Sequence, residues 1–515
     1  MRNLLRSPNL NLSFLKPAGV AFIFLVTHPP ELASAQNTGP GDPTQSRNWA
    51  PAAINHAQQM MRFKDTDHGS QTPPGSIPVF STAPDPSGLV ATYQPAGPTD
   101  TGNAFFQSIG TNGRSCFTCH RPENGWTISA ASAQARFEAS AGADPLFRLV
   151  DGATCPTDDV SSPGAKRQAY KLVIEKGLIR IGLALPPTVQ FEVVNVADPY
   201  YCTTNPVTGL TSPTTGIASV YRRPLPSTNL GFLSAIMWDG REPSLTSQAV
   251  DATLGHAQAS APPTAGQQGQ IVSFETGIFT AQIFDNKAGN LNAGGATGGP
   301  VALHDQLAKF FIGVNDPLAQ NPTGAPFDPN IFDLYSSPNG GDDIGVVAKF
   351  GSSIANGQRL FNTRAINITR VTGLNDVLNK PSIAGFCGTC HDTPDVGNHS
   401  VKAPLNIGIA NAGANAPPAL DISGLPVFTL RCTGGPLSGQ IFVVTDPGRA
   451  LISGNCADIG KVKGPILRGL AARAPYFHNG SAATLFDVVN FYDQRFGIDF
   501  TRREKEDLVN FLNAL

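Results

Sequence analysis

Hydrophobic positions recur at helical spacing in two internal stretches of the chain. They predict helices over Ile54–Phe63 and over Ile354–Phe361, of which the second is amphipathic. Alternation of apolar and polar residues, which is typical of a half-buried strand, is nowhere sustained long enough to indicate a β architecture. The pattern therefore predicts a mostly α fold.

Capping residues predict two more helices at the C-terminal end. Thr484 stands three residues before Asp487, and Thr501 stands three residues before Glu504, which is the spacing of a helix N-cap. These helices are expected over the ranges Leu485–Phe491 and Arg502–Asn513. One side of the last helix is apolar and is expected to join the core through Leu508, Phe511, Leu512 and Leu515.

Segments rich in glycine and proline separate the predicted helices. The chain contains 53 glycines and 44 prolines, which is roughly a fifth of its residues against an average of about 12%. Residues 36–55 are expected to form a polar arm and Gln71–Thr101 a loop. Residues 258–345 are expected to be a loop-rich insertion that leads into a second domain near residue 346.

The first 35 residues have the pattern of an export signal. Basic residues precede an apolar run over Ala18–Val26, and the small residues of Ala33–Ala35 suit a signal peptidase. A membrane anchor is the alternative, but a span takes about 20 apolar residues and a proline pair interrupts this stretch. We expect residues 1–35 to be a cleaved signal peptide, and the mature protein, with no later span, to be periplasmic or secreted.

Composition excludes binding modes that depend on charge. Only 14% of the 515 residues are charged and the net charge is −2, against about 25% charged residues in an average soluble domain. A nucleic-acid or membrane-surface binder is therefore not expected. The hydrophobic share of 41% is sufficient for a sizeable core.

Two copies of the pattern Cys-x-x-Cys-His carry the clearest chemical signal. Chance would produce about 0.002 matches in a chain of this composition, so both indicate covalent attachment of a c-type haem. Two thiols at this spacing reach the two vinyl groups of one porphyrin, and the adjacent imidazole ligates the iron. The residues are Cys116, Cys119 and His120 in the first motif and Cys387, Cys390 and His391 in the second.

Two other uses of Cys-x-x-Cys are weaker alternatives for these motifs. A zinc site or a thioredoxin-like redox pair would also use this spacing. The motifs are 271 residues apart and each has its own histidine, so a haem in each half is the favoured interpretation.

The remaining cysteines are expected to form structural disulfides, because an even number is left over in an exported chain. The favoured pairs are Cys155 with Cys202 and Cys432 with Cys456, since each closes a loop within one haem-bearing half. A redox role for these cysteines is less favoured.

The motifs resemble those of the bacterial di-haem cytochrome c peroxidases, a family that includes MauG. The resemblance is carried by the two haem motifs, by Trp238–Arg241 between them, and by Pro465–Arg468 leading to Ala474–Ser481. It implies two cytochrome c-like haem domains with long loops and insertions, over residues 36–345 and 346–515. It also implies that the N-terminal haem is the active site and that the C-terminal haem relays electrons.

Tyr492 is the expected second ligand of the C-terminal haem. In the peroxidases a methionine ligand lies fourteen residues after the histidine of the Pro-Tyr-Phe-His motif, and Tyr492 stands fourteen residues after His478. MauG-like members use a tyrosine there, and a hard anionic ligand favours ferric iron. His399 is a competing ligand, and a merely hydrogen-bonded tyrosine is another alternative. The methionines left after signal cleavage are Met60, Met61 and Met237, none of them in the C-terminal half.

The distal side of the N-terminal haem is expected to be open, because no histidine lies between His120 and His256. The resemblance places the distal glutamine of the family at Gln248 and its catalytic glutamate at Gln258. An amide orients a peroxide but does not exchange protons. His256 is the candidate for proton transfer, because imidazole ionises near neutrality, with a purely structural hydrogen bond as the alternative.

The resemblance gives provisional roles to other residues between the haems. Trp238 is expected to relay electrons from one haem to the other, with an ordinary buried tryptophan as the alternative. Arg241 and Arg468 are candidates to pair with haem propionates or to form structural salt bridges. A calcium ligand of the family falls on Arg223, so calcium is not favoured as a cofactor beside the two haem c groups. His478 is expected to belong to the domain interface.

The function implied is that of an exported di-haem c-type oxidoreductase. Its expected partners are hydrogen peroxide or dioxygen, and a small redox protein that donates electrons. The residues expected to act in catalysis are Gln248, His256 and Trp238. An electron-transfer cytochrome without its own substrate, or a dioxygenase-like relative of the rubber oxygenases, is the alternative.

Overall fold

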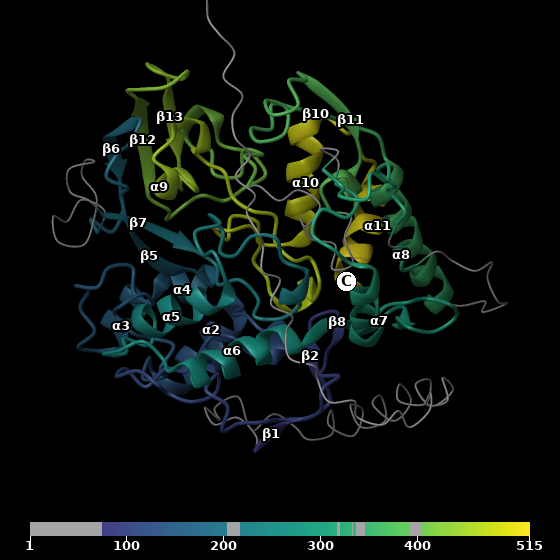
Figure 1. Ribbon diagram of the computed structural model, residues 1–515, viewed down its shortest axis with the longest axis horizontal. Helices are drawn as coiled ribbons and strands as arrows, with labels where there is room; N and C mark the ends of the chain where they lie inside the picture. Colours follow the sequence, from purple (N-terminus) through teal and green to yellow (C-terminus); the bar gives the residue numbers. More distant parts are fainter. Residues whose placement is uncertain (1–74, 203–216, 317–319, 332, 336–345, 392–403) are drawn as a thin grey trace, which may run out of the picture. The chain divides into compact units, whose positions relative to one another are not determined.

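The computed structural model describes residues 75–202, 217–316, 320–331, 333–335, 346–391 and 404–515 (Figure 1). All of them belong to one compact unit, His56–Leu515. The signal peptide over residues 1–35, the helix over Ile54–Phe63, the boundary at residues 345 and 346, and His399 lie outside the described residues or at their edge.

The prediction of a mostly α fold is wrong. The structure is 31% helical and 19% strand, and its strands form several small sheets. The strands are short, and the pairings at the centre of the two larger sheets join segments far apart in the chain, so local alternation of apolar residues does not reveal the sheets.

The largest sheet has four strands in the order β2-β3-β8-β9. It begins with the hairpin of β2 (Phe80–Asp85) and β3 (Gly88–Tyr93), within the stretch predicted to be a loop. Pro84 hides this strand in the sequence, and the structure accommodates it because β2 lies at the sheet edge. The central pair, β3 with β8 (Phe279–Asp285), is mostly buried, and the short β9 (Gly289–Asn290) completes the sheet.

A second sheet joins segments from both sides of residue 345. Strand β12 (Val427–Cys432) pairs antiparallel with β6 (Phe191–Ala197) and with β13 (Ile441–Val444). The predicted disulfide between Cys432 and Cys456 is confirmed and fixes the end of β12. Cys155 and Cys202 are both buried, and both lie near Tyr221. The disulfide between them stays a prediction.

Three two-stranded sheets complete the strand content of the described residues. Strand β5 (Ile179–Ala184) pairs with β7 (Ile217–Arg222), which leads into the Arg223 region. The others are β1 (Ser76–Ile77) with β4 (Thr99–Asp100), and β10 (Ile366–Thr369) with β11 (Ser382–Gly385).

The C-terminal helices form where their caps predict them. Thr484 and Thr501 each close a capping box, which opens α10 (Leu485–Phe496) and α11 (Arg502–Asn513). The amphipathic stretch near residue 354 lies inside α8 (Val346–Thr363), which packs along α11. Gly357 allows this approach, since a Cβ there would overlap the carbonyl oxygen of Asp507. Figure 1 shows α8, α10 and α11 together beside β10 and β11.

The remaining helices lie mainly in the first half of the chain. The segment 258–345, predicted to be loop-rich, contains α6 (Ala265–Gly277) and α7 (Pro300–Asp305) in addition to β8. The other helices are α2 (Ala130–Ser140), α3 (Pro163–Ala169), α4 (Lys171–Lys176), α5 (Leu245–Gly255) and α9 (Ala450–Ser453). None of the helices in the described part of the chain has the length and apolar character that a membrane span requires.

Candidate haem sites

The two haem motifs fold into the same local structure. Each forms a 3-10 turn, over Cys116–Thr118 and over Cys387–Thr389. In each, the threonine hydroxyl accepts a hydrogen bond from the backbone N–H just before the first cysteine, at 3.0 Å and 2.8 Å. The histidine N–H then bonds back to the carbonyl of the first cysteine. The spacing of the pattern therefore fixes this geometry locally.

The first motif opens onto a large cavity. Cys116, Cys119 and His120 all line it, and its volume is about 1380 Å³ including the part open to solvent. Two thiols and one imidazole on the wall of a single cavity fit the attachment of a haem c.

The His120 imidazole is already oriented for metal binding. Its Nδ1 lies 2.9 Å from the carbonyl oxygen of Trp126 and 3.0 Å from the hydroxyl oxygen of Ser227. A protonated Nδ1 that donates to these acceptors leaves Nε2 as the iron ligand. Burial lowers the pKa of His120 to about 4, so the ring is neutral at neutral pH, as ligation requires.

Helix α5 brings the predicted distal residues into the first cavity. Gln248 and the C-cap residue His256 are eight positions apart, so they lie on one face of the helix. Both line the cavity, together with Ala252 between them. Gln258 is exposed just beyond the helix, where its amide oxygen accepts a hydrogen bond from Asn112, and it is not among the cavity-lining residues described.

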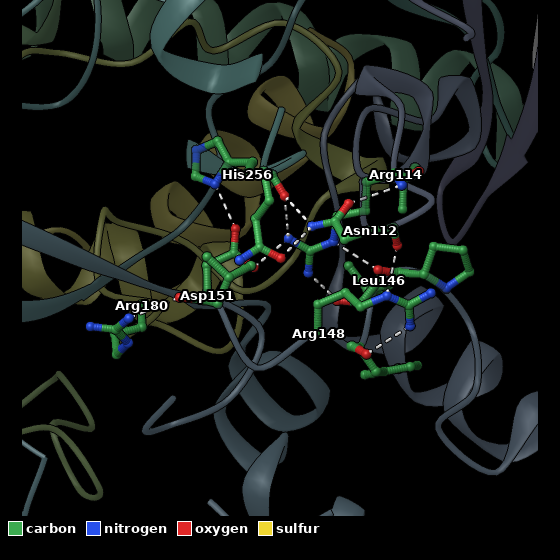
Figure 2. A network of polar contacts seen from close by, with 12 residues as sticks. Asn112, Arg114, Leu146, Arg148, Asp151, Arg180 and His256 are labelled. Atoms are coloured by element: carbon green, nitrogen blue, oxygen red, sulfur yellow. Dashed lines mark hydrogen bonds and ion pairs between the residues drawn. The ribbon is translucent and has the colours of Figure 1, made fainter. Parts of the chain in front are cut away.

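A buried carboxylate that the sequence analysis missed orients His256. Oδ2 of Asp151 lies 2.5 Å from Nδ1 of His256, and Oδ1 accepts from Arg114 at 2.5 Å (Figure 2). Arg114 also donates to the carbonyl of Leu146 at 2.6 Å, and the Asn112 amide donates to the carbonyl of His256 at 2.8 Å. Asp151 is 105 residues from His256, and nothing in the local sequence marks it.

The charge on Asp151 is stabilised despite its burial. Burial raises the pKa of its carboxyl, but the charge of Arg114 and the hydrogen bond to His256 outweigh this effect, so the pKa is lower than usual. The carboxylate therefore holds Nδ1 of His256, which leaves Nε2 as the nitrogen available for proton exchange.

The second motif opens onto a different kind of cavity. Cys387, Cys390 and His391 line it, and its volume is about 1440 Å³ including the part open to solvent. The rest of its wall is mostly aliphatic and aromatic, from β10, α10, α11 and the segments 405–409 and 462–478. The donor set again fits a haem c.

Tyr492 faces the second cavity from α10. It lies among the rings of Phe477, Phe491 and Phe496. Burial, then the nearby Cys390 and Cys387, raise the pKa of its phenol. An apolar site of this kind keeps a phenol neutral unless a cation replaces its proton, which is what a ferric iron does.

Trp238 and Lys463 line both cavities. The Trp238 indole is buried, donates its N–H to the carbonyl of Arg223 at 2.7 Å, and lies 6.0 Å from the fully buried His478 ring. The backbone N–H of Lys463 in turn donates to the Trp238 carbonyl at 2.8 Å. Lys463 carried no signal in the sequence analysis.

Similarity to known proteins includes a family match near the C-terminal end of the chain. A family described as RoxA-like, cytochrome c-like, matches residues 462–497. Cytochrome-c peroxidase IdrP2 of Denitromonas iodatirespirans is 35% identical over 143 residues, which is 25% of this chain and 36% of the relative. Cytochrome c551 peroxidase of Nitrosomonas europaea is 24% identical over 261 residues, 48% of this chain and 66% of the relative. The predicted resemblance to bacterial cytochrome c peroxidases is confirmed.

The chain thus spans less than two thirds of either relative. Among solved structures, a MauG-like protein associated with microbial copper homeostasis aligns with 59% of this chain and 75% of its own, at 17% identity. Its TM-score of 0.31 is too low to support an argument about the fold.

Arg223, where the resemblance led us to expect a calcium ligand, is buried among backbone carbonyls. Its guanidinium donates to the carbonyls of Ile128 and Arg473 at 2.7 Å each, and to that of Lys176 at 3.2 Å. Burial, together with the nearby Arg473, lowers its pKa to about 9. A side-chain cation therefore gathers backbone carbonyls at the position where the family resemblance would put a calcium ligand.

The other predicted residues are placed as follows. Arg241 lines the first cavity and contacts both carboxylate oxygens of Asp239 at 3.0 Å. Arg468 is buried near Tyr335 and is not among the residues described as lining either cavity. His478 lies 3.6 Å from Asp446, and burial lowers the pKa of its imidazole to about 4.

Proposed function

We propose that this chain is an exported di-haem c-type oxidoreductase with its reactive haem on His120. It reduces hydrogen peroxide, or uses peroxide or dioxygen as an oxidant, with electrons that pass through the haem on His391. The observation that carries the proposal is the Asp151–His256 pair, because it places an oriented imidazole in the cavity of the first haem motif.

The residues of the first cavity suit the reduction of a peroxide. Reduction of hydrogen peroxide to two water molecules consumes two electrons and two protons, and the haem supplies the binding site for the oxygen and the electrons. His256 takes a proton from the bound peroxide oxygen through Nε2 and returns it to the leaving oxygen. Asp151 keeps Nδ1 protonated during this exchange, and the Gln248 amide orients the peroxide by hydrogen bonding.

Electrons reach the first haem through Trp238 in this proposal. Support comes from its place in the wall of both cavities and from its buried, hydrogen-bonded indole. Tyr492 is the proposed second ligand of the C-terminal haem, supported by its position in the cavity of His391. A small redox protein is the proposed external donor.

The competing function is electron transfer without a substrate. His256 supports it equally by its location, since the same Nε2 that exchanges protons is able to ligate the first iron. Electron paramagnetic resonance of the ferric protein separates the two functions. One high-spin and one low-spin haem are expected for the enzyme, and two low-spin haems would establish the carrier.

Steady-state turnover completes the test. The protein, with two haems per chain by the pyridine haemochrome assay, is expected to oxidise a reduced small cytochrome when hydrogen peroxide is added. Turnover with dioxygen but not with peroxide would favour an oxygenase, which the match to a RoxA-like family makes the second candidate. Export predicts a mature N-terminus at Gln36, which mass spectrometry of the periplasmic fraction checks.

A further inference from the structure

The segment that leads into the first haem motif packs directly against the end of α5. This segment comprises residues 110–114, and the chain continues beyond α5 through residues 256–258. A Cβ at Gly110 would overlap the carbonyl oxygen of Ala257, so the two backbones touch at this point. The backbone N–H of Thr111 donates to the same carbonyl at 3.1 Å. The stretch of chain that carries the haem cysteines is therefore joined to the stretch that carries His256.

Side chains of the 110–114 segment add hydrogen bonds to this junction. The Asn112 amide donates to the carbonyl of His256 at 2.8 Å, and Arg114 donates to the same carbonyl at 3.3 Å (Figure 2). The Thr111 hydroxyl donates to the carbonyl of Gln258 at 2.7 Å. Asn112 is itself held in place, because its amide oxygen accepts from the backbone N–H of Arg114 at 3.1 Å.

His256 is therefore fixed at both its ring and its backbone. Asp151 holds Nδ1 of the ring at 2.5 Å, and Asn112 holds the carbonyl. This carbonyl lies at the C-terminal end of α5, where no further turn of the helix supplies a donor. With both points fixed, Nε2 keeps one place in the cavity that His256 shares with the haem motif. Such placement matters, because a shift of about 1 Å in a reacting group can cost about 100-fold in rate.

We propose that Asn112 is a positioning residue that acts on proton transfer in the first cavity through His256. Asn112 is not among the residues described as lining that cavity, so its effect passes through the residue it holds. Because Asn112 lies on the 110–114 segment, haem attachment and the placement of His256 depend on one piece of backbone. The inference rests on the role of His256 as the proton-transfer group, which is part of the proposed function.

The test separates proton transfer from access to the first haem. Hydrogen cyanide gives up its proton when its carbon binds ferric iron, and hydrogen peroxide gives up a proton when its oxygen binds, so both need a base. Nε2 of His256 accepts that proton in each case. Carbon monoxide binds ferrous iron without any proton transfer. A change confined to cyanide and peroxide therefore reports the placement of the base, whereas damage to the cavity would slow all three ligands.

Asn112→Ala in the full di-haem protein is expected to slow peroxide reduction and cyanide binding about 10-fold. Stopped-flow mixing measures both rates. The binding of carbon monoxide to the ferrous first haem, followed after flash photolysis, is expected to stay unchanged. Thr111→Val, which removes one hydrogen bond from an exposed residue, is expected to slow cyanide and peroxide by less. The double variant N112A/H256A is expected to be no slower than H256A, because Asn112 acts only through His256.

Asn103→Ala is the matched control. The Asn103 amide donates to the carbonyl of Gln270 at 3.1 Å, and its amide oxygen accepts from the backbone N–H of Phe105 at 2.9 Å. Asn103 thus makes the same two kinds of contact as Asn112 without touching His256, and its replacement is expected to change none of the three rates.

Three results would overturn the proposal. They are wild-type cyanide and peroxide rates in N112A, an equal loss for carbon monoxide, or a rate in N112A/H256A below that of H256A. If N112A does not accumulate, unchanged cyanide and peroxide rates in T111V overturn it instead.

The two proposals fail in different ways. A wild-type protein that binds cyanide but reduces no peroxide would overturn the proposed function, while the cyanide rates of the variants would still decide the role of Asn112. Normal peroxide turnover in both the wild type and N112A would overturn this inference alone.

Discussion

The two cavities share a haem motif and differ in almost everything around it. Both motifs form the same turn, with the same threonine cap. In both, the backbone N–H of the histidine donates a hydrogen bond to the backbone carbonyl of the first cysteine. The first cavity adds charged residues from several segments, among them Arg114, Asp151 and Glu275. In the second, Lys463 is the one Asp, Glu, Lys or Arg side chain among the described lining residues.

This difference supports the separate tasks that we propose for the two haem centres. Peroxide chemistry needs groups that move protons and polarise ligands, and the first cavity supplies them through His256 and its buried partners. Electron transfer needs a stable environment that reorganises little, and the apolar wall around Tyr492 suits it. The surroundings, more than the motif, distinguish a reactive haem from a relay.

His256→Ala is expected to produce the largest change in the rate of peroxide reduction. An unchanged rate would contradict the assignment of the first cavity as the reactive one. Loss of the acid–base group is expected to slow peroxide reduction by about 100- to 10,000-fold. Stopped-flow mixing with hydrogen peroxide measures the rate. His304→Ala is the matched control, because His304 also contacts an aspartate but is not among the residues described as lining the first cavity. Equal rates in the two variants would show that His256 has no catalytic role.

Asp151→Asn is expected to lower the rate of peroxide reduction too, but by less than His256→Ala. An asparagine leaves Nδ1 of His256 less firmly held, and a rate loss of about 10- to 100-fold is expected by analogy with the outer partners of metal-bound histidines. Arg114 also loses its buried charge partner, at a cost of about 3 to 5 kcal/mol in unfolding free energy. Asp305→Asn makes the same change at the exposed His304 pair and should affect neither quantity.

Trp238→Phe tests whether the two cavities are electronically connected. The indole lines both of them, so its replacement is expected to slow electron transfer between the haems several-fold without altering peroxide binding. Flash photolysis of the half-reduced protein measures the transfer directly. An unchanged transfer rate would assign Trp238 to packing alone.

Tyr492→Phe tests the second cavity by itself. Removal of the phenolic oxygen is expected to change the absorption and paramagnetic resonance spectra of the haem on His391, and to leave those of the haem on His120 unchanged. If neither spectrum moves, Tyr492 is not a ligand.

Glu275 is expected to make the stability of the folded protein depend on pH. Its pKa rises from 4.5 to about 7 on burial, so the folded protein keeps a proton that the unfolded chain loses between these values. The stabilising contribution is complete below pH 4.5 and is lost as the pH rises to 7, by about 3 kcal/mol at most. Thermal unfolding across this range is expected to show the wild type losing stability relative to Glu275→Gln. Parallel curves would show that the carboxyl titrates normally.

The features that the sequence predicted correctly are those that depend on residues close together in the chain. The capping boxes at Thr484 and Thr501 form as expected because their hydrogen bonds span three residues. The Cys432–Cys456 disulfide was also predicted, since it closes a short loop. Strands were missed where pairing is distant, as between Ala91 and Ala281, and also in the local hairpin of β2 and β3, where Pro84 interrupts the strand pattern.

The sequence by itself determined the two haem motifs, their proximal histidines and the helix that carries Tyr492, because each depends on spacing within a few residues. Only the tertiary structure decided which side chains surround each motif. Asp151 meets His256 across 105 residues, and Ser227 meets His120 across 107. Such contacts depend on how sheets and helices pack, and a charge buried by distant segments leaves no local trace in the chain.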